Sequence, residues 1–123
     1  ASSMGVYLGI ANSNTTIADF NQGEGDVVVL SDAQFGLGNS GTLAAADYDE
    51  STSAMSGTAH NYGLDSGSNN TGDGIVAIQN GSNVELWHTT ALEAASTANS
   101  TLVATLSNVN TSALDNTNFV LAV

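Results

Sequence analysis

The most constraining feature of this chain is its charge: it contains twelve acidic residues, and both lysine and arginine are absent. A compact chain that carries one sign of charge repels itself, and here no lysine or arginine offsets the repulsion. The compensating cations must therefore come from solution, as bound metal ions or as salt. Because no side chain can neutralise a phosphate, we expect no nucleic-acid partner and no membrane insertion.

The rest of the composition describes one domain with a small aliphatic core. The chain has 123 residues, of which 41% are hydrophobic but only 6% aromatic, so a single modest core must be built from valine, leucine, isoleucine and alanine. Cysteine is absent, which excludes disulfides and thiolate metal sites. No apolar run reaches the length of a membrane-spanning helix.

Short β-branched and alternating segments predict a mainly β fold. The surest unit is a hairpin, in which the apolar runs 74–79 and 84–88 flank an Asn-Gly turn at 80–81. We therefore predict a mainly β, single-domain fold, such as an antiparallel β-sandwich, with short helical turns; a β-roll-cap-like fold is the alternative that the family resemblance described below implies. Further strands are expected at 4–10, 27–30, near 55–62, at 102–106 and at 119–123, helical turns at 31–34, 42–47 and 112–115, and a short helix or loop crossing at 91–98.

Residues 1–16 are expected to form an N-terminal strand and turn ahead of the main β domain at 17–123. Apolar residues occupy every second position from Met4 to Ile10, so one face of this strand is apolar. The segment can be an ordinary edge strand of its own sheet. It can also add to the sheet of a neighbouring subunit, in which case the partner of the chain is a copy of itself in a homopolymer.

Three groups of oxygen-bearing side chains are candidate calcium sites. Calcium binds about six to eight oxygens from carboxylates, amides and backbone carbonyls. The alternative is that these side chains only solvate loops and cap turns. We expect calcium as the cofactor because nothing else in the chain can offset its charge. The candidate metal ligands are Asp19, Glu24 and Asp26 in the first group, Asp47, Asp49 and Glu50 in the second, and Asp65, Asn69 and Asp73 in the third.

The sequence contains no catalytic motif, and we expect that the chain is not an enzyme. Ser56 lies near His60 in the sequence, but the turn that presents a nucleophilic serine in hydrolases is missing. His60 and His88 are too few and too dispersed to predict a zinc site, and a phosphate-binding loop would need a lysine. Both histidines are expected in loops or on a sheet surface.

Four segments form an ordered set from residue 17 to the end of the chain. They are Ile-Ala-Asp-Phe at 17–20 with Gly-Glu-Gly-Asp-Val-Val-Val-Leu-Ser at 23–31, Gly-Thr-Leu-Ala-Ala-Ala-Asp-Tyr at 41–48, the hairpin at 73–87, and Val-Ala-Thr-Leu at 103–106 with Asn-Phe-Val-Leu at 118–121. In this order they resemble the C-terminal region of secreted hemolysin-type calcium-binding proteins, the RTX (repeats-in-toxin) group. The resemblance implies a fold that caps a calcium-binding β-roll, and export by a type I system that reads an uncleaved C-terminal signal.

The chain departs from that group in two places. The glycine-rich nonapeptide repeat of the β-roll is absent, so the resemblance does not imply a stacked ladder of calcium ions. After the hairpin, where relatives often carry a second run of Asp and Gly, this chain has His88-Thr89-Thr90.

Two functions are predicted from these features. The first is a non-enzymatic, secreted, calcium-binding structural protein that self-assembles into an extracellular filament, sheath or surface layer at the cell surface. The second is the C-terminal capping and type I secretion module of a larger RTX toxin, protease or adhesin.

Overall fold

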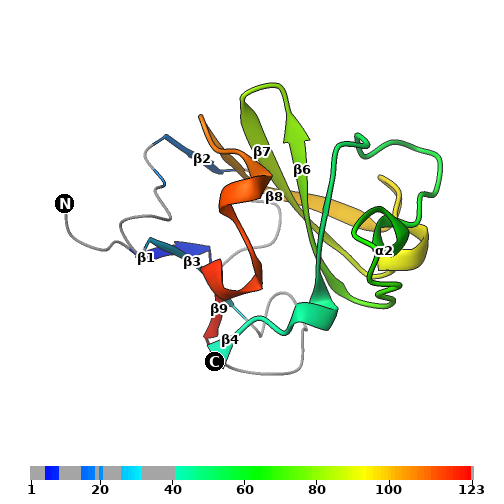
Figure 1. The fold of residues 1–123 in the computed structure, drawn as a ribbon, viewed down its shortest axis with the longest axis horizontal. Coiled ribbons are helices and arrows are strands. Elements are labelled where there is room, and N and C mark those ends of the chain that lie inside the picture. The colour runs from blue at the N-terminus through cyan, green and yellow to red at the C-terminus, as the bar shows by residue number, and fades with distance from the viewer. Residues whose placement is uncertain (1–4, 9–14, 19, 21–25, 32–40, 123) are drawn as a thin grey trace.

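The fold is that of a computed structural model, which describes residues 5–8, 15–18, 20, 26–31 and 41–122. Strands dominate this part of the chain, with one short α-helix and several 3-10 turns between them (Figure 1). The strands are β1 (Gly5–Leu8), β2 (Thr15–Ile17), β3 (Val27–Ser31), β4 (Gly41–Thr42), β5 (Tyr48–Ser51), β6 (Gly74–Asn80), β7 (Asn83–Thr89), β8 (Ser100–Leu106) and β9 (Phe119–Ala122), and the helix is α2 (Tyr62–Asp65).

The strands of the described residues form two sheets that share one core. One sheet has the order β1-β3-β9-β4 and the other β2-β8-β7-β6-β5. The predicted mainly β, sandwich-like single domain with short helical turns is confirmed, but the sheets are mixed rather than purely antiparallel. Parallel pairing joins β1 to β3, β3 to β9, β2 to β8 and β5 to β6.

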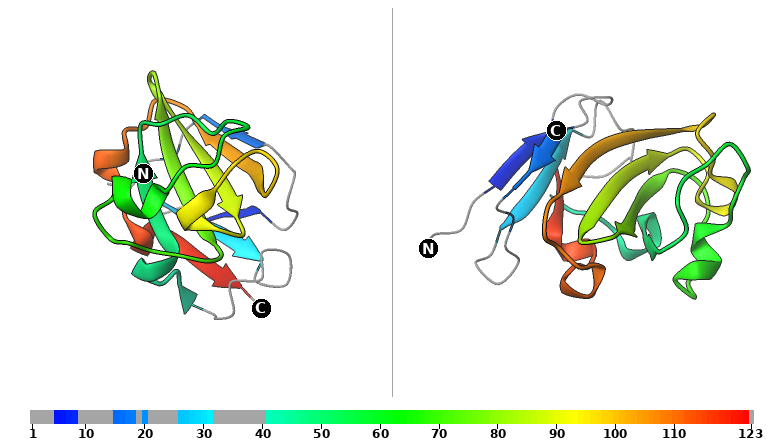
Figure 2. Two further views of the ribbon diagram at one scale, coloured as in Figure 1. Left: turned by 90° about the vertical axis from the view of Figure 1, so that its right-hand side faces the viewer. Right: turned by 90° about the horizontal axis from the view of Figure 1, so that it is seen from above.

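The parallel pairs arise because the chain crosses over before it returns to the same sheet. Parallel neighbours need a long connection, whereas antiparallel neighbours need only a turn. Between β1 and β3 the chain passes through β2 in the other sheet, and between β5 and β6 it passes through α2. Figure 2 shows β1, β2 and β3 together at one end of the molecule. A sequence pattern of alternation identifies strands but does not reveal such crossovers.

The predicted hairpin is confirmed. β6 and β7 pair in antiparallel register from Gly74 opposite Thr89 to Asn80 opposite Asn83. The turn itself is Gly81-Ser82, one position later than the Asn-Gly pair suggests, and Gly81 has a φ of 63°. A two-residue hairpin turn requires a positive φ at its first position, which glycine adopts without strain.

The shared core lies between the two sheets. Val28 of β3 and Phe119 of β9 face Ile75 of β6 and Leu86 of β7, and all four side chains are at most 1% exposed. On β3 the buried Val28 and Leu30 alternate with half-buried neighbours, as expected for a strand with one face on a core.

β6 is buried on both faces. Residues 74–78 are all buried, which a strand covered on one side only would not show. Ile75 and Ala77 belong to the shared core, whereas Val76 and Ile78 pack with Tyr62 of α2 in a second cluster. The chain between β5 and β6 therefore forms a layer over the outer face of this sheet.

The expected helical turns are present as 3-10 helices. The Asn110 side chain caps the 3-10 helix at 111–113, and Asp115 forms a capping box at the 3-10 helix at 116–118. The 3-10 helices are Ala45–Asp47, Leu92–Ala94, Thr111–Ala113 and Asn116–Asn118. Residues 32–34 of the turn expected at 31–34 lie outside the described residues, and Ser31 ends β3.

Several sequence assignments differ from the structure, one of which is β2, formed by Thr15–Ile17 where a turn was expected to follow the N-terminal strand. The strand expected near 55–62 is wrong, because this segment makes only an isolated bridge between His60 and Ala95. Conversely, no strand was expected after the turn at 42–47, and residues 48–51 form β5, which pairs with β6. Asp49 and Glu50 give β5 no apolar alternation, so the usual sequence signal of a strand is missing.

Replacing Phe119 with alanine should lower the free energy of unfolding by about 3 to 5 kcal/mol, because a fully buried ring that bridges the sheets leaves a cavity. Phe119 also packs against Tyr48, with ring centroids 5.1 Å apart. Urea denaturation followed by circular dichroism measures the loss. Leu64→Ala is the matched control, since Leu64 is 61% exposed and should change stability by less than about 0.5 kcal/mol. Equal losses for the two variants would contradict a core shared by both sheets.

Candidate functional site

The largest concentration of described acidic side chains surrounds a cavity of about 400 Å³ beside β5. Its walls come from β5, from the segment that follows α2, and from the residues around the last 3-10 helix. A second cavity of about 390 Å³ shares two of its acidic residues and extends to Ser51, Ser53 and Thr111. The acidic residues of the first cavity are Asp49, Glu50, Asp65 and Asp115, and we call it the acidic pocket.

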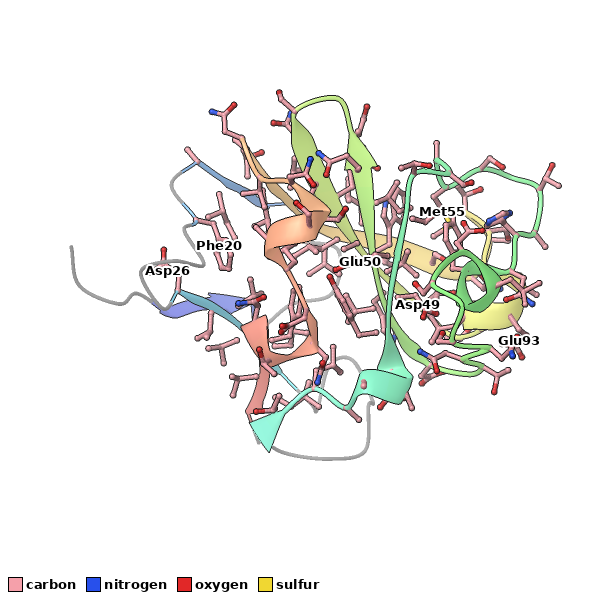
Figure 3. The ribbon with its side chains drawn as sticks, in the orientation of Figure 1. Phe20, Asp26, Asp49, Glu50, Met55 and Glu93 are labelled. Atoms are coloured by element: carbon pink, nitrogen blue, oxygen red, sulfur yellow. The ribbon has the colours of Figure 1, made fainter. Side chains whose placement is uncertain are left out.

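Alternation along β5 sends its side chains to opposite faces. Tyr48 points toward the shared core, where it packs against Phe119, and its hydroxyl donates a 2.7 Å hydrogen bond to Glu50. Asp49 points the other way, toward the segment that follows α2, where Ser68 and Asn70 contact it. Figure 3 shows Asp49 and Glu50 on the two sides of the strand.

Asp49 is the most deeply buried acid of the pocket, with 1% of its surface exposed. Its Oδ1 accepts hydrogen bonds from the Ser68 hydroxyl at 2.8 Å and from Asn70 Nδ2 at 2.9 Å. Its Oδ2 is buried without a hydrogen-bond partner. Burial raises the pKa of Asp49, and the charge of Asp65 adds to the rise, while the hydrogen bonds oppose it. The hydrogen bonds therefore offset only part of the cost of burying the ionised Asp49 carboxylate.

The pKa of Asp65 shifts in the opposite direction from that of Asp49. Burial acts to raise its pKa, but hydrogen bonds from Ser51 and His60 outweigh burial, and the pKa lies below the ordinary value. His60 Nε2 lies 2.6 Å from Asp65 Oδ2, and the Ser51 hydroxyl donates to the same oxygen. The His60 ring also meets the Tyr62 ring edge-on, with centroids 4.6 Å apart. These contacts fasten the end of α2 to β5.

Side chains close the outer edge of β5. The Ser66 hydroxyl accepts a 2.7 Å hydrogen bond from the Glu50 amide and donates a 3.0 Å bond to the Glu50 carbonyl. Asn70 Nδ2 donates to the Tyr48 carbonyl at 3.2 Å. Backbone groups that another strand would otherwise bind are thus paired inside the chain, which protects this sheet edge from further strand addition.

Glu50 and Asp115 form the other side of the pocket. Burial raises the pKa of Glu50, the Tyr48 hydroxyl lowers it, and the charge of Asp115 raises it. Burial likewise raises the pKa of Tyr48, as does its hydrogen bond to Glu50. Asp115 caps the 3-10 helix at 116–118 by accepting from the Thr117 amide at 2.8 Å. Sequence analysis missed Asp115 as a site residue, because a capping aspartate carries no signal of its distant neighbours.

The structure combines parts of the predicted acidic groups. From the second group Asp49 and Glu50 line the pocket, and from the third group Asp65 does so. Asp47, Asn69 and Asp73 lie outside its lining, and Asn69 has a left-handed φ of 57° in an exposed turn.

From the first group Asp26 is buried immediately before β3, whereas Asp19 and Glu24 lie outside the described residues. Within the part of the chain that the structure describes, no set of three or more acidic or histidine side chains is arranged to hold a metal ion. Calcium binding therefore stays a prediction.

The histidines have local roles. Ser56 bonds the backbone of Thr58, and His60 pairs with Asp65, so the structure draws the neighbouring Ser56 and His60 into separate contacts. His88 lies within β7 opposite Ile75. Both positions agree with the expectation of a loop or a sheet.

Comparison with known proteins adds nothing to these observations: no family model, no curated protein and no solved structure matches the chain. The likeness to the hemolysin-type group thus rests on the sequence motifs alone. None of the helices among the described residues has the length and apolarity needed to cross a membrane.

In calcium-free buffer, lowering the pH should first raise and then reduce the melting temperature. Asp49 and Glu50 have raised pKa values, so the folded state takes up protons before the unfolded chain does, and stability increases as the pH falls toward about 4. Asp65 has a lowered pKa. Its contribution is complete above the ordinary aspartate pKa and is lost as the pH falls through the lowered value.

Thermal unfolding followed by circular dichroism between about pH 8 and about pH 3 measures this profile. Asp49→Asn removes one of the two groups with a raised pKa, so its increase on acidification should be smaller than that of the wild type. A melting temperature that only decreases below neutral pH, or equal profiles for the two proteins, would contradict the assignment.

Proposed function

We propose that this chain is the capping module of a larger secreted, calcium-binding protein of the hemolysin type, and that it has no enzymatic activity of its own. The observation that supports this role is an asymmetry between the ends of the two sheets. Among the described residues, both sheets finish at one end in a strand with no further neighbour, and at the other end side chains close the longer sheet. A domain with one open and one closed end is suited to terminating a stack of strands.

The open end consists of β1 and β2. Each is the terminal strand of its sheet among the described residues, and each pairs in parallel with the strand behind it. The two strands lie at the same end of the molecule (Figures 1 and 2). Because β1, β2 and β3 alternate between the sheets, one further coil of chain would add one parallel strand to each sheet.

Thr16 marks the open edge of β2. The Ile17 carbonyl accepts a 2.9 Å hydrogen bond from the Ser107 amide at the end of β8. Since the backbone groups of neighbouring residues in a strand point to opposite sides, the N–H and C=O of Thr16 point away from β8. Its side chain is also exposed. An incoming strand would therefore bind the backbone of Thr16.

The closed end consists of β5 and β4, whose edges are covered or short. Ser66 and Asn70 occupy the backbone groups of β5, and β4, the last strand of the other sheet, has only two residues. Natural sheets avoid uncontrolled pairing by covering or shortening edge strands in these ways. β1 and β2 have no such cover among the described residues, which favours another strand as their partner.

A second candidate is the self-assembling extracellular structural protein, because the same open edges could accept a copy of the chain. β1 pairs with β3 of its own chain, so addition of the N-terminal strand to a neighbour would require exchange. Contact between two identical open ends produces a closed pair. A filament, sheath or surface layer would need a further contact besides these two edges. Calcium would screen the repulsion between subunits that each carry a net charge of −12.

Amide hydrogen exchange should show that the edge of β2 is occupied in the native polypeptide. In the isolated chain the Thr16 amide should exchange rapidly and the Ile17 amide, which points toward β8, slowly. In the polypeptide recovered from its source both should be protected, and its intact mass should be well above 12.4 kDa. A native mass near 12.4 kDa, or a Thr16 amide that exchanges rapidly in the native polypeptide, would contradict the capping role.

Thr16→Pro tests the self-assembly candidate. Proline removes the outward-pointing N–H while the bonds from β2 to β8 remain, so self-association should weaken by about tenfold, the value of one lost hydrogen bond. Thr16→Val is the control, because it changes the side chain and keeps the N–H. Sedimentation velocity in calcium-containing buffer measures both. If the proline variant assembles as well as the valine variant, the β2 edge is not the contact.

A further inference from the structure

We propose that Asp49 anchors a calcium site in the acidic pocket. In this site Asp49 and Asp65 supply the negative charge, and the hydroxyls of Ser66 and Ser68 supply neutral oxygens. All four residues line the same cavity. The inference rests on the proposed calcium-binding role and assigns that role to a particular place in the fold.

The observation that carries the inference is the buried, unpartnered Oδ2 of Asp49. The residue is 1% exposed, and Oδ1 accepts the hydrogen bonds from Ser68 and Asn70, whereas no donor lies within hydrogen-bond geometry of Oδ2. A buried polar atom without a partner destabilises the folded state, and more strongly when it carries charge. The oxygen needs either a proton or a cation.

The surroundings of Asp49 favour a cation over a proton at neutral pH. Asp65, Glu50 and Asp115 line the same cavity, and together they create a negative potential that attracts positive ions. No lysine or arginine exists anywhere in the chain to provide an internal counter-charge. His60, the histidine nearest to the pocket among the described residues, is already paired with Asp65.

The donor set fits calcium better than other common divalent ions. Carboxylate and hydroxyl oxygens are hard ligands, and calcium accepts irregular combinations of charged and neutral oxygens with bound water. Magnesium demands a nearly ideal octahedron, and zinc prefers sulfur and nitrogen. A cavity of about 400 Å³ leaves room for several water ligands, each of about 30 Å³. Two acidic ligands completed by neutral oxygens also agree with the lack of a cluster of three acidic or histidine side chains among the described residues.

Bound calcium would tie two separate segments together. Asp49 belongs to β5, whereas Asp65 is the last residue of α2 and Ser66 and Ser68 follow it, 16 to 19 residues after Asp49. The same segment closes the β5 edge through Ser66. Calcium in the pocket would therefore strengthen the closed end of the sandwich.

Terbium luminescence tests the site directly. Terbium replaces calcium at oxygen sites, and Tyr48, which lines the cavity, can transfer excitation energy to it. The wild-type chain should give a saturable signal that calcium displaces. Asp49→Asn should weaken calcium affinity by about tenfold or more, as expected for loss of an anionic ligand. Because burial raises the pKa of Asp49, this variant should remain folded in circular dichroism.

Asp73→Asn is the matched control. Asp73 is an exposed acid from the same segment and does not line the pocket, so its removal lowers the net charge equally and should leave the calcium affinity within about twofold of the wild type, as for a surface charge. If Asp49→Asn binds calcium like the wild type, the site is wrong while calcium binding elsewhere stands. If the wild type gives no calcium-displaceable signal, both the site and the calcium role fail, whereas the capping role is decided separately by the Thr16 amide and the native mass.

Discussion

Neutral hydrogen-bond donors do the work in this fold that lysine and arginine do in most proteins. Asp49 is held by Ser68 and Asn70, and Asp65 by the Ser51 hydroxyl in addition to its ion pair with His60. Hydroxyls, amides and indoles stabilise a carboxylate without cancelling its charge. The described part of the chain therefore stays folded with its net charge intact. Further pairs are Glu50 with Tyr48, Glu85 with Asn80 and Trp87, Glu93 with the Gly72 amide, and Asp115 with the Thr117 amide.

This constraint explains a composition that could be mistaken for disorder. Serine, threonine and asparagine are abundant, and such residues usually signal loops. Here their side chains donate hydrogen bonds to the acidic groups. They also bond the backbone groups at the edge of β5 that a neighbouring strand would otherwise bond. Asn70 illustrates both uses, because its amide donates to Asp49 and to the backbone carbonyl of Tyr48. An arginine in its place would bring a charge and a longer side chain to a buried site.

The parts of the fold that could be predicted are the local ones. The β6–β7 hairpin follows from two apolar runs and a glycine turn, and the strands β3, β8 and β9 follow from their β-branched runs. β5 could not be predicted, since its buried Asp49 is paired by Ser68 and Asn70, which lie 19 and 21 positions away. The pocket was missed for the same reason. Asp49, Asp65 and Asp115 meet only because the chain crosses between sheets.

The position of the acidic pocket relates the charge of the chain to its proposed role. A cap must accept strands at one end and refuse them at the other. At the closed end the edge of β5 is held by Ser66 and Asn70. Both residues belong to the segment that follows Asp65, and this segment also covers Asp49. Repulsion between Asp49 and Asp65 acts to separate this segment from β5. A cation between them reverses that force, so the same ion that satisfies a buried oxygen would also keep the edge closed.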